Sequence, residues 1–393
     1  MTTTKNNEHK KLNVPNLRFP EFQGEWNSFL INDVCSEFKS GKNIKADSIF
    51  ESGEYPVYGG NGLRGYTSSY NHEGSYVLIG RQGALCGNVR SVYGKTYITE
   101  HAIAVAGNEK SNTNFLHYLF LKMNLGQYSD QSAQPGLAVN KLLKLKVALP
   151  IISEQAKIAK LLSLLDERIA TQNKIIDKLQ SLIKGMEDNL LDNPLWEKTY
   201  LRSFMQFFPT NSLSWEQLSY KEGAIRNLHY GLIHGLQTRG INSASLPMIK
   251  NEAIPKQYTL CQVGDVAFAD ASEDTGEIAK SVEIVDTIEG DTICGLHTIH
   301  GRDIKNWTVV GFKGFAFNSR YFHNQIKRLA QGTKVFSITA NNLSSCYVYL
   351  PDLETQKAIV NLLKTYEAKL LVNKRLLEHY EKQKQYLLRQ MFI

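Results

Sequence analysis

Cysteine is scarce in this sequence of 393 residues, and no two cysteines form a CxxC pair. The five present are odd in number and far apart: Cys35, Cys86, Cys261, Cys294 and Cys346. A small disulfide-stabilised secreted fold needs paired cysteines at close spacing. The sequence therefore excludes that class, and we expect a protein of the reducing cytoplasm.

Long apolar runs are also missing. Residues 1–13 are polar and charged, without the hydrophobic stretch of a signal peptide. No later segment offers the roughly 18 uninterrupted apolar residues that a membrane-spanning helix requires. We therefore expect neither export nor membrane insertion.

The common catalytic motifs are absent. The sequence contains no GxxxxGK[ST] phosphate loop, no GxSxG elbow and no HExxH zinc motif. Asp352, Glu367 and Lys369 have the residue types of a metal-dependent nuclease, but Glu367 and Lys369 fall in a helical pattern rather than on adjacent strands. Cys294, His297 and His300 lack a clear fourth ligand, so we expect no metal site.

The composition is that of an ordinary folded protein. Hydrophobic residues make up 42% and charged residues 21% of a chain long enough for two or three domains. The net charge of +7 suits a polyanionic partner such as DNA, and it equally suits a protein with no such partner.

A long internal repeat organises the chain. The segment from Leu149-Pro150 aligns without a gap with that from Leu350-Pro351, an offset of 201 residues. Upstream, Trp26 and Trp196 open similar stretches. Between these shared ends the two copies diverge, and short β-like runs alternate with polar turns. The repeat predicts an α+β protein in which two α/β domains alternate with two long helices, with pseudo-two-fold symmetry.

The segments after the two prolines carry a heptad pattern. Apolar residues recur at alternating spacings of four and three from Ile158 to Leu190 and from Ile359 to Met391. One polar residue interrupts each seam, Gln172 and Asn373. We expect an antiparallel coiled coil in which these two residues share a buried polar layer that sets the register. Two independent amphipathic helices are the alternative.

These patterns give the expected boundaries. Residues 1–150 form the first globular domain, with 1–15 flexible, and 151–192 form the first helix. Residues 193–350 form the second domain and 351–393 the second helix. Within the first domain we expect strands over 75–79, 96–99 and 103–106 and a helix over 114–123.

Both globular domains place hydrogen-bond donors in polar loops. Side chains such as Arg81 and Gln82, beside exposed glycine, can approach a phosphate backbone and reach base edges. A solvated charge or a turn residue is the competing interpretation for each of them. The candidate DNA-binding residues are Lys39, Lys42, Asn61, Arg64, Arg81, Gln82 and Gln134 in the first domain, and Tyr230, His234, Arg239, Ser272 and Lys334 in the second.

Several short segments form a further pattern along the chain. They are 16–22 (NLRFPEF), Gly24-Glu-Trp26, 56–62 (PVYGGNG), 80–84 (GRQGA), Glu100-His101, Gln134-Pro-Gly136 and Leu149-Pro150 leading to Glu154-Gln155. Together these segments resemble a known family, the DNA specificity subunits of type I restriction-modification systems. The second copy departs from the pattern, because Thr355 stands where the first copy has Glu154.

The resemblance implies a non-catalytic DNA-binding subunit that takes part in host defence and DNA methylation. Each globular domain would be a target recognition domain for one half of a bipartite, asymmetric site, and the helices would set the spacing between the halves. It also implies partners: two modification subunits, which methylate adenine with S-adenosylmethionine, and restriction subunits, which translocate and cut DNA with ATP and magnesium. This chain would bind no cofactor of its own.

Two other classes stay open from the residues alone. One is a scaffold whose coiled coil recruits proteins while the globular domains bind something other than DNA. The other is a self-sufficient metal nuclease that uses Asp352, Glu367 and Lys369. Magnesium-dependent cleavage by the purified chain alone would identify the nuclease, and the partner of the coiled coil would identify the scaffold.

The polar interruption of the heptads gives a first prediction. Replacing both Gln172 and Asn373 by Leu removes the buried polar layer, so we expect a more stable helix pair that no longer holds one register. Thermal unfolding measures the stability, and disulfide trapping between engineered cysteines measures the register. A double variant with unchanged stability and register would contradict the shared polar layer.

Overall fold

The computed structural model describes residues 13–130, 135–236, 239–286 and 290–393. The chain divides into two compact units. Unit 1 runs to Asn173 and includes Leu376–Ile393, and unit 2 is Lys174–Arg375. Two long helices, α3 (Ile152–Leu191) and α8 (Leu353–Gln390), contribute to both units. The expected flexibility of 1–15 concerns mostly residues outside the described ranges.

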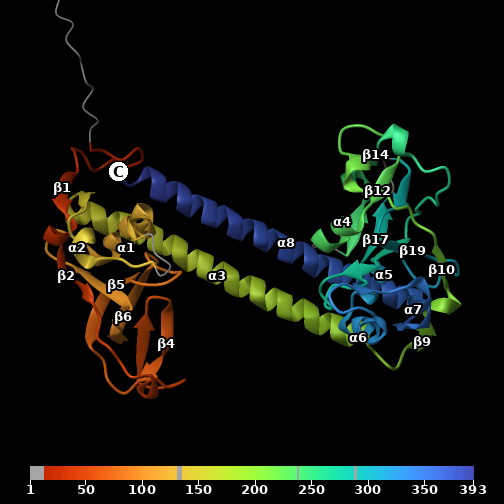
Figure 1. Cartoon of the computed structure of the whole chain (residues 1–393), viewed down its shortest axis with the longest axis horizontal. Helices are drawn as coiled ribbons and strands as arrows, with labels where there is room; N and C mark the ends of the chain where they lie inside the picture. The colour runs from red at the N-terminus through yellow and green to blue at the C-terminus, as the bar shows by residue number, and fades with distance from the viewer. Residues whose placement is uncertain (1–12, 131–134, 237–238, 287–289) are drawn as a thin grey trace, which may run out of the picture. The chain divides into compact units, whose positions relative to one another are not determined.

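Unit 1 contains a six-stranded sheet with the strand order β2-β7-β5-β6-β3-β4. Helix α1 packs on β5, β6 and β7 (Figure 1). The three strands and the helix expected from the sequence are confirmed, although β5 and β6 extend further. The elements are β1 (Asn27–Leu30), β2 (Cys35–Ser40), β3 (Tyr55–Gly59), β4 (Gly62–Thr67), β5 (His72–Gly80), β6 (Val89–Ile98), β7 (Ala102–Gly107), α1 (Thr113–Met123), α2 (Val139–Leu142) and β8 (Lys146–Leu149).

Unit 2 is built on a five-stranded sheet of order β10-β19-β15-β17-β13 and a four-stranded sheet of order β11-β14-β12-β18. Its elements up to β15 are β9 (Glu197–Tyr200), β10 (Met205–Phe208), β11 (Leu218–Ser219), β12 (Arg226–Leu228), α4 (Tyr230–Gly235), β13 (Gly240–Asn242), β14 (Met248–Ile249) and β15 (Val266–Ala269). The later ones are β16 (Ala271–Ser272), β17 (Ser281–Asp286), β18 (Thr292–Cys294), β19 (Thr298–Asp303), α5 (Phe312–Ala316), α6 (Arg320–Leu329), β20 (Phe336–Ser337), α7 (Ala340–Ser345) and β21 (Tyr347–Leu350).

The internal repeat is present as a two-stranded frame in each unit. In unit 1, β1 follows Trp26 and pairs antiparallel with β8, which precedes Pro150. In unit 2, β9 follows Trp196 and pairs in the same way with β21, which precedes Pro351. The parts of the sequence that match between the copies therefore form the same structure twice, whereas the divergent parts form different sheets.

A buried glutamine secures the start of each long helix. The side chain of Gln155 accepts a hydrogen bond from the Asn112 amide at 2.8 Å and donates to the carbonyls of Lys110 at 2.9 Å and Pro150 at 2.8 Å. Gln356 makes the same three bonds in unit 2, to Val309, Trp307 and Pro351. We call this arrangement the glutamine clamp; both side chains are fully buried.

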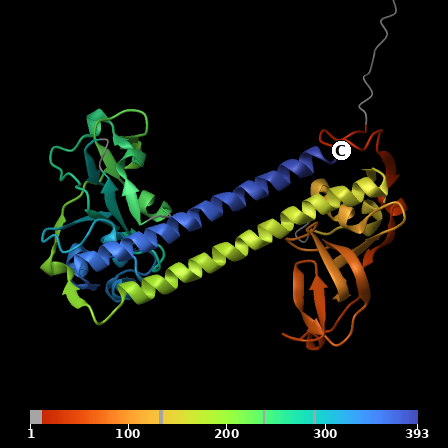
Figure 2. The same ribbon diagram turned by 180° about the vertical axis from the view of Figure 1, so that it is seen from behind.

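The long helices run antiparallel within each unit. In unit 1 the start of α3 shares a hydrophobic core with the end of α8, and Lys384 forms an ion pair with Asp166 at 2.6 Å (Figure 2). In unit 2 the end of α3, at Leu191, shares a core with Ile359 and Leu363 near the start of α8. The predicted antiparallel pairing is therefore confirmed inside both units.

The two polar seam residues belong to different units. Gln172 is buried in unit 1, and Asn373 is half-buried in unit 2, where its side chain donates to the Lys369 carbonyl at 2.7 Å. Their shared layer would join the two units and stays a prediction.

The end of α8 also completes the core of unit 1. Phe392 stacks on Phe115 with ring centroids 5.1 Å apart and meets Trp26 edge-on at 6.4 Å. Leu17 donates its backbone N–H to the Gln390 carbonyl. Arg18 binds the buried carboxylate of Glu154 through two nitrogens at 2.7 Å, a strong bidentate ion pair. Residues from both ends of the sequence thus stabilise one core.

Two carboxylates lie where the helices pack in unit 2, Glu187 buried and Glu367 half-buried. Burial raises the pKa of Glu187, against the attraction of Arg239, whose guanidinium lies 3.4 Å away. Burial also raises the pKa of Glu367 to about 7; the charge of Arg239 opposes this shift and the carboxylate of Glu187 adds to it. Glu367 is therefore partly protonated at neutral pH.

The glutamine clamp makes a prediction about stability. Gln155→Ala removes three hydrogen bonds and leaves buried backbone groups unpaired, so we expect unit 1 to lose about 3 kcal/mol. Hydrogen exchange of the α1 and β8 amides during denaturant unfolding measures the loss within this unit. Gln383→Ala, at an exposed position of α8, is the control and should change stability by less than about 0.5 kcal/mol. Equal effects of the two substitutions would contradict the clamp.

The half-buried carboxylate of Glu367 makes a prediction about pH. In the unfolded chain its pKa is near 4.5, and in the folded chain near 7, so the folded state binds the proton more tightly. Stability is then lost as the pH rises between these values, by about 1 to 3 kcal/mol after allowance for solvent screening. Glu367→Gln should remove that part of the pH dependence and stabilise the protein at pH 8, as measured by denaturant unfolding. A variant that follows the wild-type pH profile would refute it.

Candidate nucleic-acid interface

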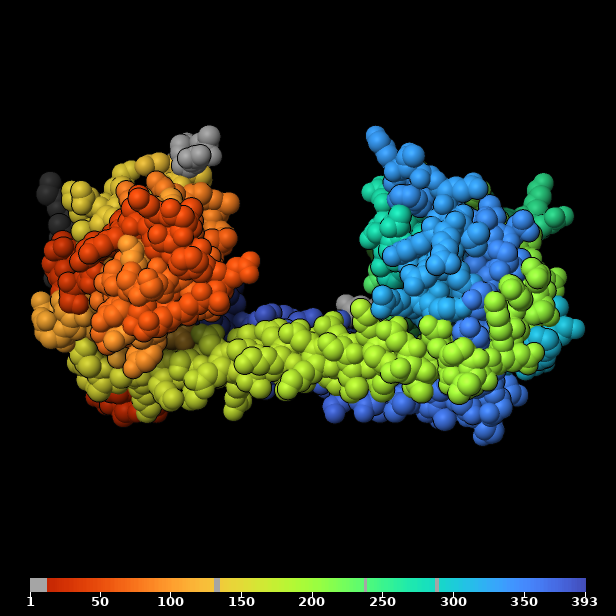
Figure 3. Space-filling model, turned by 90° about the horizontal axis from the view of Figure 1, so that it is seen from below, coloured from red at the N-terminus to blue at the C-terminus, as the bar shows by residue number. Residues whose placement is uncertain are grey.

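A shallow groove in unit 1 gathers three of the predicted residues. Asn61 and Arg64 come from the β3–β4 hairpin, and Gln82 from the loop after β5. The groove has a volume of about 350 Å³ and is also lined by Leu63 and His101. All three predicted side chains are exposed. Figure 3 shows residues of this part of the chain, in orange, on the surface of unit 1.

Glycine allows the two loops to approach each other. A side chain at Gly60 would place its Cβ 2.6 Å from the His101 carbonyl, and one at Gly80 would meet the Leu85 and Gly60 carbonyls at 2.4 and 2.9 Å. Any larger residue would push the hairpin and the loop apart. These glycines therefore bring Asn61, Arg64 and Gln82 into one groove.

The backbone of Arg81 is fixed between three segments. Its N–H donates to the His101 carbonyl at 3.0 Å, and its carbonyl accepts from Leu137 at 2.9 Å. Lys42 is exposed beyond the end of β2 and its N–H donates to the Ile98 carbonyl, near the turn that carries His101. This positioned set of donors could contact phosphates or base edges.

Two further predicted residues of this domain are Lys39 and Gln134, and the structure describes only the first. Lys39 lies on β2 and forms an ion pair with Glu37 at 3.2 Å, while its side chain stays 69% exposed. Burial alone would raise the pKa of Glu37, but hydrogen bonds from Lys39 and His72 hold it below its usual value. A phosphate would compete with that carboxylate for Lys39. Gln134 lies outside the described residues.

Sequence reasoning missed Arg90 in this region. Its guanidinium carbon lies 3.2 Å from where a Cβ on Gly62 would be, so it covers the β3–β4 hairpin. Arg90 lies on β6 and is exposed. The linear sequence carries no signal for this contact, because β6 reaches the hairpin through the pairing of the sheet.

In unit 2 the predicted Tyr230 is part of a row of aromatic rings. Tyr230 begins α4 and lies 4.7 Å from His229, which in turn lies 4.5 Å from Trp215. Burial, followed by the nearby His297, lowers the pKa of His229, so this ring is neutral at pH 7 and its Nδ1 accepts the Gly231 N–H as a helix cap. Trp215 is exposed and Tyr230 is half-buried, so these two rings can stack on bases, whereas His229 is buried and supports them from behind. Trp215 and His229 were missed, although the His229-Tyr230 pair was a signal.

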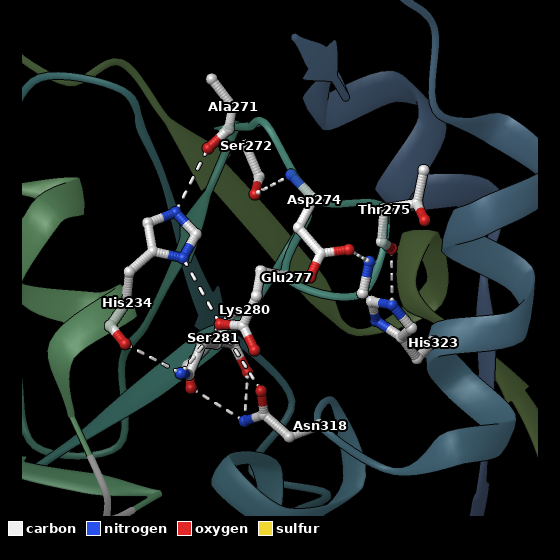
Figure 4. A network of polar contacts seen from close by, with 11 residues as sticks. His234, Ala271, Ser272, Asp274, Thr275, Glu277, Lys280, Ser281, Asn318 and His323 are labelled. Carbon is white, nitrogen blue, oxygen red and sulfur yellow. Dashed lines mark hydrogen bonds and ion pairs between the residues drawn. The ribbon is translucent and has the colours of Figure 1, made fainter. Parts of the chain in front are cut away.

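His234 and Ser272 belong to a network of polar contacts on one side of unit 2 (Figure 4). His234 contacts the Ala271 carbonyl at 3.3 Å through Nε2 and Glu277 at 3.6 Å through Nδ1. Ser272 accepts a hydrogen bond from the Asp274 amide. Strand β16 pairs with β20, which begins two residues after the exposed Lys334. The fold thus brings Ser272 near the loop that carries Lys334.

Arg239 shares a cavity with Glu277 and Lys280 of this network. It lines a cavity of about 480 Å³ together with Glu187 and Glu367, and its ion pair with Glu187 ties the domain to α3. That contact gives Arg239 a structural role, and its role in DNA binding stays a prediction.

The nuclease residue types have structural roles instead. Asp352 caps the start of α8, where Thr355 donates to it from its backbone at 2.9 Å and from its hydroxyl at 2.7 Å. Among the described residues, neither Asp352 nor Glu367 belongs to a cluster of three metal-ligating side chains. No helix in the described parts of the chain is long and apolar enough to cross a membrane.

Comparison with known proteins agrees with this geometry. The Escherichia coli type I restriction enzyme EcoprrI specificity subunit is 42% identical over 154 residues, 38% of this chain and 38% of that protein. The match thus spans about two-fifths of that relative. The Methanocaldococcus jannaschii type I restriction enzyme MjaVIII specificity subunit is 27% identical over 290 residues, 68% of this chain and 67% of that protein.

A solved structure and a family model also match this chain. The crystal structure of a type I restriction-modification system S subunit from M. genitalium covers 97% of this chain and 99% of its own, with a TM-score of 0.68 at 16% identity, which supports the fold. The model of the type I restriction modification DNA specificity domain matches residues 23–181 and 302–381, more than half of the chain. The chain therefore belongs to the family of type I restriction-modification DNA specificity proteins.

Proposed function

We propose that this protein is the non-catalytic, sequence-specific DNA-binding subunit of a type I restriction-modification complex. Each globular domain is a target recognition domain that binds one half of a bipartite, asymmetric DNA site. The long helices set the spacing between the half-sites and bind the methyltransferase subunits.

One observation supports this proposal above the others. Two identical frames, each with the strand pair and the glutamine clamp, carry two different sheets. A scaffold with two equal partners would have no need of different domains. A protein that recognises two unlike half-sites requires two different surfaces on equivalent supports.

The proposed partners are double-stranded DNA, two modification subunits and the restriction subunits, in the cytoplasm. The chain needs no cofactor to recognise DNA, and S-adenosylmethionine, ATP and magnesium act in the partner subunits. Phosphate contacts should supply most of the affinity and a steep salt dependence, and base-edge contacts should supply the discrimination.

The test is a genome-wide map of N6-methyladenine in cells that express this protein with its modification subunit. We expect a split motif that disappears when this gene alone is deleted. Exchange of the 27–149 domain for that of a relative should change one half of the motif only. If the modification subunit is active and no split motif depends on this gene, the proposal is wrong.

A single substitution sharpens the same experiment. Arg81→Ala removes a positioned donor of unit 1, so binding should weaken about 10- to 100-fold, or recognition should relax, at one half-site. Lys146→Ala, at an exposed cation on the frame strand β8, is the control and should leave the motif intact. If Arg81→Ala altered neither affinity nor motif, Arg81 would lie outside the interface.

A further inference from the structure

Three side chains that bind soft metals meet in the interior of unit 2. The Sγ atoms of Cys261 and Cys294 lie 3.6 Å apart. These sulfurs and a ring nitrogen of His300 all lie within 4.8 Å of one another. The exposed fractions of the three residues are 8%, 3% and 0%. The two cysteines belong to the core against which Tyr230 packs, so the cluster lies beneath a candidate DNA-binding residue rather than on the surface.

The hydrogen bonds of His300 leave one ring nitrogen available to a metal. Its Nε2 lies 2.7 Å from Asp265 Oδ2, so the carboxylate fixes the proton on that nitrogen. Its Nδ1 is buried and has no hydrogen-bond partner among the residues that the structure describes. A histidine that binds a metal through one nitrogen commonly donates from the other to a carboxylate. Ordinary packing does not explain a buried nitrogen lone pair without a partner.

Asp265 is itself held in place. Arg302 donates to both of its oxygens at 2.7 and 2.8 Å, and the backbone N–H of Gln262 donates to Oδ2 at 2.8 Å. Gln262 directly follows Cys261. One carboxylate therefore positions both the imidazole of His300 and the loop that carries Cys261.

The sulfur separation fits a shared ion. Two thiolates bound to zinc at about 2.3 Å in tetrahedral geometry lie about 3.8 Å apart. The observed 3.6 Å is close to this value, whereas a disulfide requires about 2.05 Å. The two thiols thus already stand at the spacing of zinc ligands.

We propose that Cys261, Cys294 and His300 bind one zinc ion. In the sequence, His297 rather than Cys261 stood beside Cys294 and His300 as a candidate ligand, and no fourth ligand followed, so we expected no metal site. The fold turns His297 outward, where it pairs with Asp270 and its side chain is 51% exposed. Cys261 takes its place through long-range packing.

The fourth ligand is a water molecule. Zinc sites with three protein ligands hold water in the remaining position. Cys294 borders a cavity of about 390 Å³, which Thr210, Asn211 and Thr259 also line. Asn211 donates to the backbone carbonyl of Cys294 at this cavity, so the cavity reaches the end of the strand that carries one of the ligands.

The ion would join the two sheets of the domain. Cys294 ends β18 of the four-stranded sheet, and His300 lies in β19 of the five-stranded sheet. Cys261 precedes β15, the neighbour of β19. The site would therefore stabilise the second recognition domain and take no part in chemistry.

The test uses the full-length protein and metal ions alone. After dialysis against zinc and gel filtration, we expect about one zinc per chain by mass spectrometry. The content should fall at least about tenfold in Cys261→Ser and Cys294→Ser and stay unchanged in Cys346→Ser, a buried cysteine outside the cluster. Asp265→Asn should weaken zinc binding about 10- to 100-fold, because Asp265 only positions His300.

Cobalt titration of the metal-free wild type keeps the test independent of variants that fail to fold. Bound Co²⁺ should give the ultraviolet thiolate charge-transfer band and strong visible bands of a tetrahedral site. The absence of these bands, or zinc content that does not depend on Cys261 and Cys294, would overturn the proposal. So would a mass two hydrogens lower in protein purified without oxidant, which indicates a disulfide between these cysteines.

Discussion

The buried carboxamide at the start of each long helix is the contact on which the architecture depends. A glutamine side chain offers one acceptor and two donor hydrogens on a rigid plane. Gln155 and Gln356 each bind one backbone N–H and two backbone carbonyls at the junction of domain and helix. Without the glutamine these buried backbone groups would lack hydrogen-bond partners. These three bonds, together with the packing of each helix start in its core, fix the direction in which the helix leaves its domain.

This arrangement separates what must stay constant from what can change. The strand pairs β1–β8 and β9–β21 and the clamps are nearly the same in both units, and the sheets they support are not. The second copy shows how far the frame tolerates change, because Glu154 with its Arg18 partner is replaced by Thr355, which completes a local cap with Asp352. A recognition surface can therefore diverge without altering the support.

Local patterns made the helices and the repeat predictable, whereas contacts between distant segments were not. The heptads from Ile158 and Ile359 and the short β-like runs at 75–79 and 103–106 are properties of neighbouring residues, and the structure confirms helices and strands there. Asn61, Arg64 and Gln82 are exposed, as expected, and their role in DNA binding stays a prediction; their common groove depends on how closely Gly60 and Gly80 pack. Arg90 and Cys261 gained their neighbours only through sheet pairing, which no short motif encodes.

The burial of Phe392 against Phe115 and Trp26 has a consequence for synthesis. The first domain lacks part of its core until residues that follow the whole second domain have been translated. Folding on the ribosome, which usually proceeds from the N-terminus one domain at a time, therefore leaves the first recognition domain incomplete while the second is being made. A messenger that ends early would yield a protein whose first domain is damaged by a loss at the other end of the gene.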